Sequence, residues 1–381
     1  MNTILRKQFL AHVGQTSPSP MLVEVERAEG TFFYTPEGKR YYDLVAGVSV
    51  SNVGHCNPAV VRAVQEQAAR YMHVMVYGEL VETPQVEYAA KVASLLSGGL
   101  SSLYFVNSGA EAVEGALKLA KRYTGRTELV SMRRAYHGST HGSMSMMGAP
   151  EGEEWKGAFR PLLPDVQAIE FNDFDALNRI TRRTACVLAE PVQGEAGVYP
   201  WDPDTLYDVA QFCRKNGLLL IVDEVQSGIF RCGEFPFAFQ NLGITPDIIT
   251  MAKGIASGFP MGACAARIEV AEAFEPGDHG STFGGSNLAM AAAHATLATL
   301  SRGHYDDRVT EVGDYFAEKL AQVEGVTEVR GMGLMLGADL EEGIDAHKVV
   351  AQGLEEGFLL NATGSNTLRF LLSLIHISEP T

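Results

Sequence analysis

The centre of the chain contains three largely apolar runs, each of which ends at a charged residue. The runs and the residues that follow them are 185–189 with Glu190, 218–222 with Asp223, and 247–252 with Lys253. Apolar runs of this length without alternation are typical of strands buried on both faces of a parallel sheet. The carboxyl ends of such strands open into the ligand crevice of an α/β fold. We therefore predict that the acids and the lysine meet beside a ligand.

Strand and helix patterns alternate from about residue 45 to about residue 290, without internal repeats or low-complexity blocks. This alternation is the βαβ order of a mostly parallel central sheet flanked by helices. Outside it we predict a hairpin at 32–44, helices at 288–300 and 315–323, and short strands at 327–330 and 333–336. The expected division is a large domain at 46–290 and a smaller α+β domain that combines 1–45 with 291–381.

The composition is that of a globular protein, with 46% hydrophobic and 20% charged residues. A formal net charge of -16 argues against nonspecific binding of nucleic acid or anionic membranes, because both reward surplus Lys and Arg. The five scattered cysteines include no Cys-x-x-Cys pair and indicate reduced, structural thiols. We find no signal-peptide pattern and no apolar stretch long enough to span a bilayer, and therefore expect a cytoplasmic protein.

An amine beside a carboxylate is the pairing that pyridoxal phosphate needs. The amine of Lys253 can bond the cofactor's aldehyde carbon, and the carboxylate of Asp223 can keep the pyridine nitrogen protonated. Two other readings are weaker. The run before Asp223 also matches a Walker B strand, but the Gly-x-x-x-x-Gly-Lys-Ser/Thr loop of nucleotide triphosphatases is missing. Lys253 could also be an ordinary solvent-exposed lysine, as most lysines are. Apolar residues precede it and closely spaced glycines follow it, which argues against this alternative.

A phosphate site is predicted where the strand at 103–106 turns into the helix at 111–123. The turn Ser108, Gly109 and Ala110 would aim backbone N–H groups and the positive end of the helix dipole at an anion. Such turns also occur merely as helix caps. The phosphate prediction therefore depends on the neighbouring motifs.

Tyr136 and His137 follow the predicted strand at 129–132. An aromatic side chain at a strand's carboxyl end can lie flat on a pyridine ring, although a core tyrosine in a turn gives the same pattern. His137 and His141 are four residues apart, as metal ligands on a helix can be. We do not predict a metal site, because the glutamate of the His-Glu-x-x-His motif is absent and the segment is a poor helix former.

Six motifs together resemble those of the class III aminotransferases, in the acetylornithine, ornithine and 4-aminobutyrate branch. They occupy 107–112, 136–138, 190–195, 223–228, 252–254 and 280–285, in the order and spacing of that family. The resemblance covers almost everything from about residue 20 to 370. It implies the fold type I architecture of pyridoxal-phosphate-dependent transferases and a ping-pong transfer of an amino group to 2-oxoglutarate.

The resemblance also implies a role for each matching residue. Lys253 would bond the cofactor and move the proton, Asp223 would bind the pyridine nitrogen, and Gln226 the phenolic oxygen. The other residues that it places at the cofactor are Ser108, Gly109 and Ala110 at the phosphate, Tyr136 stacked on the ring, and His137 and Glu190. Thr282 would reach a phosphate in the neighbouring subunit, which implies a homodimer with shared active sites.

The substrate residues implied by the resemblance are Arg369 and Glu195. Arg369 matches the arginine that grips the α-carboxylate of glutamate and 2-oxoglutarate, and Glu195 matches the carboxylate that pairs with this arginine when an ω-amine is bound. Ser139 stands where the acetylornithine and ornithine enzymes carry an arginine. Val48 stands where the ornithine enzymes carry a tyrosine. Both changes leave the amino donor open.

The last ten or so residues depart from the family pattern, which continues through a terminal helix. We therefore expect this tail not to be native sequence, the terminal helix to be missing and Arg369 to be poorly held. Two alternatives to a working aminotransferase remain. One is an enzyme resembling glutamate-1-semialdehyde aminomutase, and the other is an inactive truncated member of the family.

Overall fold

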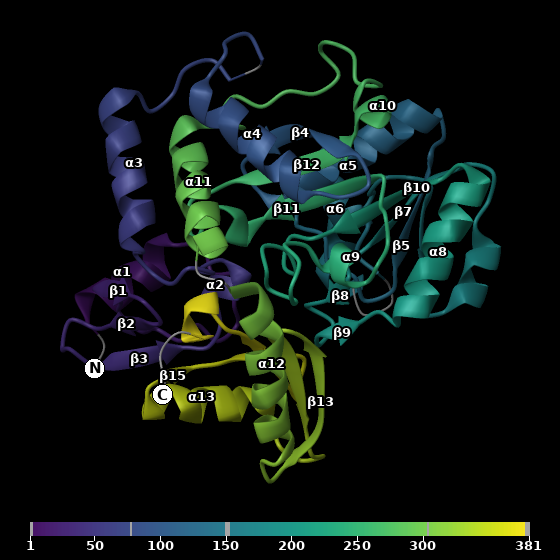
Figure 1. Ribbon diagram of the computed structural model, residues 1–381. Helices are drawn as coiled ribbons and strands as arrows, with labels where there is room; N and C mark the ends of the chain where they lie inside the picture. Colours follow the sequence, from purple (N-terminus) through teal and green to yellow (C-terminus); the bar gives the residue numbers. More distant parts are fainter. Residues whose placement is uncertain (1–2, 77, 149–152, 303–304, 378–381) are drawn as a thin grey trace.

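The structure is a computed structural model that describes residues 3–76, 78–148, 153–302 and 305–377. Figure 1 shows a large α/β region and, below it, a smaller region built from both ends of the chain. The central sheet has seven strands. In spatial order they are β4 (Leu100–Val106), β12 (Gly262–Arg267), β11 (Ile248–Ala252), β10 (Leu219–Asp223), β7 (Thr184–Ala189), β5 (Glu128–Met132) and β6 (Val166–Ile169).

The central sheet is mostly parallel, as predicted. Only β12 runs antiparallel to its neighbours, β11 and β4, whereas the other neighbouring strands pair in parallel. The three strands predicted from apolar runs, β7, β10 and β11, lie next to one another. Their charged ends therefore meet at one edge of the sheet.

Each of these three strands is buried on both faces, which explains the lack of alternation in the sequence. Val187, Leu220 and Ile249 belong to one hydrophobic core. Their neighbours Leu188, Ile221 and Ile248 belong to a second core on the opposite face. The helices around the sheet are α3 (Pro58–Arg70), α4 (Thr83–Leu95), α5 (Gly109–Thr124), α8 (Pro203–Asn216) and α11 (Asn287–Arg302).

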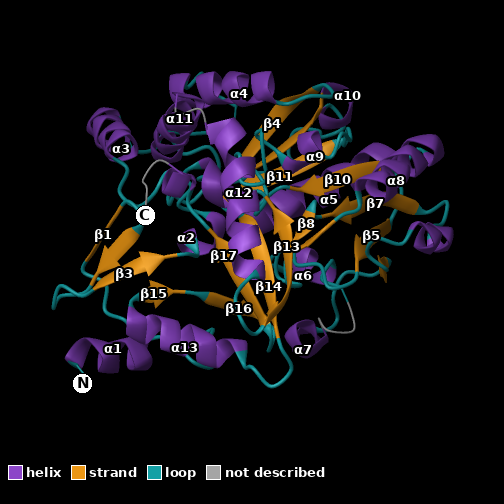
Figure 2. Ribbon diagram, turned by 60° about the horizontal axis from the view of Figure 1, so that its bottom comes forward, coloured by secondary structure: helices purple, strands orange, loops and turns teal. Residues whose placement is uncertain are grey.

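The two ends of the chain join in one small sheet. It consists of β1 (Arg27–Glu29), β2 (Phe32–Tyr34), β3 (Arg40–Asp43) and β15 (Phe358–Leu359), and β15 pairs in parallel with β3. The predicted hairpin is confirmed, because β2 and β3 pair antiparallel. A second small sheet contains β13 (Val326–Met332), β14 (Met335–Leu340), β17 (Thr367–Leu371) and β16 (Asn361–Thr363) (Figure 2).

The helix predicted at 315–323 is longer than predicted. It is α12 (Tyr305–Ala321), which begins ahead of the predicted start. The early part is strongly polar and contains Gly313, which disfavours a helix prediction. The structure explains this glycine, because a Cβ there would lie 2.3 Å from the backbone oxygen of Gly333. Close packing of the helix on the β13–β14 turn therefore requires glycine.

The remaining elements are short, apart from the helices at the two chain ends. The α-helices are α1 (Ile4–His12), α2 (Ala46–Ser49), α6 (His141–Ser145), α7 (Glu153–Lys156), α9 (Ala238–Asn241), α10 (Ile268–Ala271) and α13 (Ala346–Glu356). The short strands are β8 (Val192–Gln193) and β9 (Tyr199–Pro200), and the 3-10 turns are Gly157–Phe159, Phe174–Arg179, Lys253–Ile255 and Leu374–Ile377. Within the described ranges, no helix is both long and apolar enough to cross a membrane.

Candidate active site

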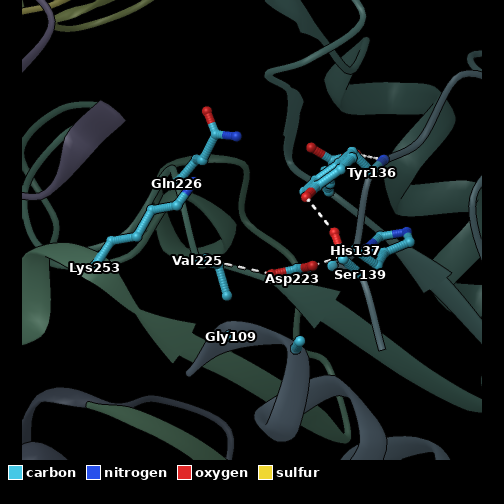
Figure 3. Close-up of a pocket in the computed structure, with 11 residues that line it drawn as sticks. Gly109, Tyr136, His137, Ser139, Asp223, Val225, Gln226 and Lys253 are labelled. Atoms are coloured by element: carbon cyan, nitrogen blue, oxygen red, sulfur yellow. Dashed lines mark hydrogen bonds and ion pairs between the residues drawn. The ribbon is translucent and has the colours of Figure 1, made fainter. Parts of the chain in front are cut away.

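A cavity of about 230 Å³ opens at the carboxyl ends of β7, β10 and β11. Most of the predicted cofactor residues line it, from segments far apart in the sequence (Figure 3). The lining residues are Gly109, Ala110, Tyr136, His137, Gly138, Ser139, Glu190, Asp223, Val225, Gln226 and Lys253. The amine and the acid on which the interpretation depends thus share one cavity.

Lys253 is a partly buried residue rather than an exposed surface lysine. It follows β11 directly with a φ of 50°, in the left-handed region that non-glycine residues rarely adopt. Burial lowers the pKa of Lys253 to about 8, although the nearby carboxylate of Glu195 opposes this shift. A Cβ at Gly254 would lie 2.6 Å from the Asn52 amide nitrogen, so the turn packs tightly. A lysine with such a pKa is partly neutral near pH 8 and can act as a nucleophile or a base.

Three donors hold the carboxylate of Asp223 at the end of β10. Its Oδ1 accepts hydrogen bonds from Thr250 Oγ1 at 2.9 Å and from the Val225 backbone N–H at 3.1 Å. Its Oδ2 lies 2.7 Å from His137 Nδ1. Thr250 and Val225 were not among the residues predicted from the sequence. A polar residue inside an otherwise apolar strand was the available signal for Thr250.

The N-terminus of α5 faces the cavity through Gly109 and Ala110. The Ser108 hydroxyl caps this helix by accepting from the Glu111 backbone N–H at 3.2 Å, and Ser108 does not line the cavity. A Cβ on Gly109 would lie 2.9 Å from Val225 Cγ1. Both sequence readings of this turn therefore have support, since the helix is capped by Ser108 and its first N–H groups border a cavity.

Tyr136 lines the cavity, so it is not an ordinary core tyrosine. Its backbone N–H donates to Glu190 Oε1 at 3.0 Å, and its hydroxyl lies 3.1 Å from Ser139 Oγ. His137 points to Asp223 instead of forming a metal site with His141. Among the residues that the structure describes, no group of three or more His, Cys, Asp or Glu could hold a metal ion.

Glu195 and Arg369 form an ion pair beside the cavity. Arg369 Nη1 donates to Glu195 Oε1 at 2.6 Å, and the same oxygen accepts from Gln226 Nε2 at 3.0 Å. Burial raises the pKa of Glu195, but Arg369 outweighs this effect and the net pKa is lowered. Glu195 is therefore a carboxylate at neutral pH.

The expectation that Arg369 is poorly held is wrong. Arg369 lies in β17, which pairs with β14 and β16, and its Nε donates to Asn361 Oδ1 at 2.9 Å. Its side chain is 3% exposed. The anchoring comes from these two strands and from Glu195. Part of the unusual tail, residues 378–381, lies outside the described residues.

Two further predicted residues lie away from the cavity lining. Val48 packs against an apolar cluster that includes Val192 and Leu371. Thr282 is exposed on the loop between α10 and α11, where the neighbouring Ser281 Oγ accepts from Asn107 Nδ2 at 3.2 Å. The substrate role of Val48 and the intersubunit role of Thr282 stay predictions.

The residues present fit pyridoxal phosphate. The cavity contains an amine, a carboxylate held by donors, an aromatic side chain and the N-terminus of a helix. It also leaves polar atoms unsatisfied, because the buried Gln226 Oε1 and His137 Nε2 have no hydrogen-bond partner within the described residues. Such atoms are costly in a protein interior unless a ligand or water completes them.

Comparisons with known proteins agree with this site. The sequence model of the aminotransferase class-III family matches residues 13–380. The acetylornithine aminotransferase of Archaeoglobus fulgidus is 42% identical over 365 residues, which cover 96% of this chain and 94% of that protein. The acetylornithine aminotransferase of Methanocaldococcus jannaschii is 41% identical, and the match covers 93% and 89% of the two chains.

Solved structures share the fold over nearly the whole chain. Ornithine aminotransferase from Toxoplasma gondii ME49 superposes with a TM-score of 0.89 at 29% identity, covering 97% of this chain and 90% of that one. An (S)-enantioselective omega-transaminase from Thermomicrobium roseum gives 0.89 at 29% identity, with 97% and 93% coverage. A further Toxoplasma gondii structure carries partial occupancy of PLP at its active site. The chain belongs to the class III aminotransferases and is a pyridoxal-phosphate-dependent transaminase.

Proposed function

We propose that this transaminase moves an amino group from an ω-amino or amino acid donor to 2-oxoglutarate by a ping-pong mechanism. The donor would be of the acetylornithine, ornithine or 4-aminobutyrate type. One observation supports this most strongly: Lys253 and Asp223 share a cavity that is flanked by the Arg369–Glu195 ion pair. An amino acid and a 2-oxo acid both carry a carboxylate that a guanidinium can bind.

Pyridoxal phosphate, when bound, supplies an electron sink for the carbanion that forms at the substrate carbon. The amine of Lys253 would take a proton from this carbon in the first half-reaction. In the second half-reaction it would give a proton to the corresponding carbon of the 2-oxo acid. Its pKa of about 8 makes it a competent base and acid near neutral pH. Asp223 would hold the pyridine nitrogen in its protonated form, and Gln226 would bind the phenolic oxygen.

The remaining cavity residues would bind and orient. Gly109 and Ala110 would direct backbone N–H groups at the phosphate, and Tyr136 would cover one face of the ring. Glu190 fixes Tyr136 by accepting from its backbone N–H. These roles follow from position in the cavity and from the matching family motifs.

Arg369 and Glu195 would act as a switch between the two half-reactions. With Glu195 in place, Arg369 is neutralised and an ω-amine without a carboxylate at this point can enter. If Glu195 swings away, Arg369 can bind the α-carboxylate of glutamate or 2-oxoglutarate bidentately. Glu195 has room for this movement, because its side chain is 27% exposed.

Two substitutions, at Ser139 and Val48, leave the amino donor open. Ser139 hydrogen-bonds Tyr136, and among the described residues that line the cavity there is no arginine. The second carboxylate clamp implied for acetylornithine and ornithine enzymes is therefore replaced by a hydroxyl. The curated relatives are named acetylornithine aminotransferases, which makes acetylornithine the first donor to test.

A homodimer is part of the proposal. Thr282 would reach the phosphate in the neighbouring subunit. Its loop is tied to this chain's own phosphate turn, because Ser281 Oγ accepts from Asn107 Nδ2 at 3.2 Å.

A donor screen with 2-oxoglutarate tests the proposed function directly. Purified enzyme supplied with pyridoxal phosphate is mixed with 2-oxoglutarate and with acetylornithine, ornithine or 4-aminobutyrate, and glutamate formation is measured. At least one donor should give glutamate, and Lys253→Ala should abolish it. Isomerisation of an amino donor without any added 2-oxo acid would instead indicate an aminomutase. No turnover with any donor and acceptor pair would contradict the proposal.

A further inference from the structure

A second cavity lies at the β5–β6 edge of the central sheet. Its volume is about 200 Å³, and it shares no lining residue with the cofactor cavity. Its walls come from β5, α6, α7, β6 and the segments that join them. The lining residues are Ser131, Ser145, Met147, Lys156, Arg160, Leu162, Leu163, Val166 and Ala168.

Ser131 brings an unsatisfied hydroxyl to this cavity. The residue lies in β5 and is 0% exposed. Its Oγ has no hydrogen-bond partner within the described residues. A buried hydroxyl without a partner is costly, and a ligand in the adjoining cavity could accept its hydrogen.

Two cationic side chains line the same cavity. Lys156 is 7% exposed, and its Nζ donates to the Met147 carbonyl oxygen at 2.6 Å. Arg160 is exposed, which places its charge where the cavity meets solvent. Among the described residues that line the cavity there is no carboxylate. In a chain with a formal net charge of -16, this wall is therefore a local concentration of positive charge that favours an anion.

The rest of the lining is apolar or already hydrogen-bonded. Ser145 Oγ donates to the His141 carbonyl oxygen at 2.6 Å and accepts from the Leu163 backbone N–H at 3.0 Å, so this hydroxyl holds the fold together. The apolar lining residues are Met147, Leu162, Leu163, Val166 and Ala168. A matching ligand has an anionic head and a short apolar tail. The cavity has the volume of roughly six water molecules, which sets the size of the ligand at about six non-hydrogen atoms.

We propose that this cavity binds a small aliphatic carboxylate. The Ser131 hydroxyl donates to one carboxylate oxygen, and Lys156 and Arg160 balance the negative charge. The tail packs against the apolar walls. The site lies apart from the Lys253 cavity, and binding there needs no transamination, so the proposal is independent of the proposed function.

The first test measures the stability of Ser131→Ala in the cofactor-loaded protein without added carboxylate. The substitution removes a hydroxyl that has no partner, so the midpoint of urea denaturation should not fall. Ser145→Ala is the matched comparison, because it removes a buried hydroxyl with two hydrogen bonds and should lower the midpoint. A fall in Ser131→Ala as large as that in Ser145→Ala would show that the Ser131 hydroxyl is structural and would overturn the proposal.

The second test is a calorimetric titration of the cofactor-loaded protein with butyrate, a carboxylate of the expected size, at an ionic strength fixed with chloride. The wild-type protein should bind butyrate saturably with a Kd of about 1 mM or below. Ser131→Ala should weaken binding about tenfold, because a hydrogen bond to a charged group is lost. Lys156→Met should weaken it about 100-fold, because a charge is lost as well. Should Lys156→Met fail to fold, Ser131→Ala alone decides.

Two controls assign the binding to this cavity and to the charge of the ligand. Arg369→Met should keep the wild-type affinity, whereas a loss of affinity would place butyrate at the cofactor cavity and overturn the proposal. Butyramide, the uncharged analogue, should bind far more weakly than butyrate, and equal binding would show that charge has no role. The absence of saturable butyrate binding, or binding of inorganic phosphate in its place, would also overturn the assignment to a carboxylate.

Discussion

Two buried arginines of this molecule, Arg231 and Arg369, are held in different ways. Arg231 is 0% exposed, and all its partners are neutral. It donates to Ser49 Oγ at 3.0 Å, to Asn52 Oδ1 at 2.6 Å, and to the carbonyl oxygens of Leu334 and Leu372. Within the described part of the chain, no carboxylate pairs with it. Arg369 is almost as buried but pairs with the carboxylate of Glu195.

The difference separates a fixed cation from an exchangeable one. The partners of Arg231 are backbone carbonyls and short side chains from three segments, and none can leave without unfolding its segment. Burial lowers the pKa of Arg231 to about 10, so it stays charged at neutral pH. The charge of Arg369 is balanced by one partly exposed glutamate, Glu195, which we propose that a substrate carboxylate replaces. A buried arginine near an active site can thus bind a substrate carboxylate only if the carboxylate that already neutralises it can move away.

Removing Arg231 should have the largest effect on stability. Arg231→Met leaves the Leu334 and Leu372 carbonyls and the Asn52 amide without a donor, and each buried unsatisfied group costs roughly 1–3 kcal/mol. We expect the free energy of unfolding of the cofactor-free protein to fall by about 3–5 kcal/mol, measured by urea denaturation. The control is Arg183→Met, which removes an exposed surface pair with Asp165 and should leave the midpoint almost unchanged. Equal effects of the two substitutions would contradict a structural role for Arg231.

Lys253 extends the comparison to a partly buried cation whose amine forms no hydrogen bond or ion pair with any other described residue. Its pKa falls from 10.5 to about 8 on folding because of burial. Between these pH values the unfolded chain binds more protons than the folded one, so stability should rise with pH across this window. The rise would be about 3 kcal/mol as an order of magnitude. Urea denaturation of the cofactor-free protein from pH 7 to 10.5 should show it, and Lys253→Met should remove it. If stability depends on pH in the same way in both proteins, the pKa of Lys253 is not perturbed by folding.

Removing Arg369 should affect binding more than folding. In Arg369→Met the substrate carboxylate loses its guanidinium, and the KM for 2-oxoglutarate should rise by about 100-fold, which corresponds to about 2.7 kcal/mol. The urea midpoint should change less than in Arg231→Met. Steady-state kinetics and urea denaturation of both variants check that Arg369→Met has the larger effect on KM and Arg231→Met the larger effect on stability. If Arg369→Met lowers the free energy of unfolding as much as Arg231→Met does, both arginines have a structural role and the proposed difference between them is wrong.

Much of the site could be predicted because strands buried on both faces leave a plain signal. The apolar runs locate β7, β10 and β11, and the residue after each run enters the cavity. Glu190, Asp223 and Lys253 were found in this way. The residues that hold these side chains in place leave a weaker signal. Thr250 stands out only as a polar residue in an apolar strand, Val225 acts through its backbone N–H, and Asn361 reaches Arg369 from a neighbouring strand, so all three were missed.

The segment around Val48 shows a second limit of sequence reasoning. Ala46, Gly47, Val48 and Ser49 all have positive φ angles, and Val48 has a φ of 62°. A β-branched residue avoids this region, so no pattern of residue types predicts such a turn. The structure stabilises it from both sides, through Asp43 at the backbone of Ala46 and Arg231 at Ser49. The domain boundaries at 45–46 and 290–291 stay predictions.

Neutralising Glu195 should give the smallest effect and the sharpest test of exchangeability. In Glu195→Gln the amide cannot balance Arg369, so the arginine is free to bind a substrate carboxylate more often. The ratio of kcat/KM for an α-amino acid to that for an ω-amine should rise by about tenfold, or about 1.4 kcal/mol. Glu170→Gln is the control, because Glu170 pairs with Arg133 and lies outside the cavity lining. An unchanged ratio would mean that Glu195 does not gate Arg369. The arginine would then be as fixed as Arg231, and selection between the two half-reactions would have to come from elsewhere in the cavity.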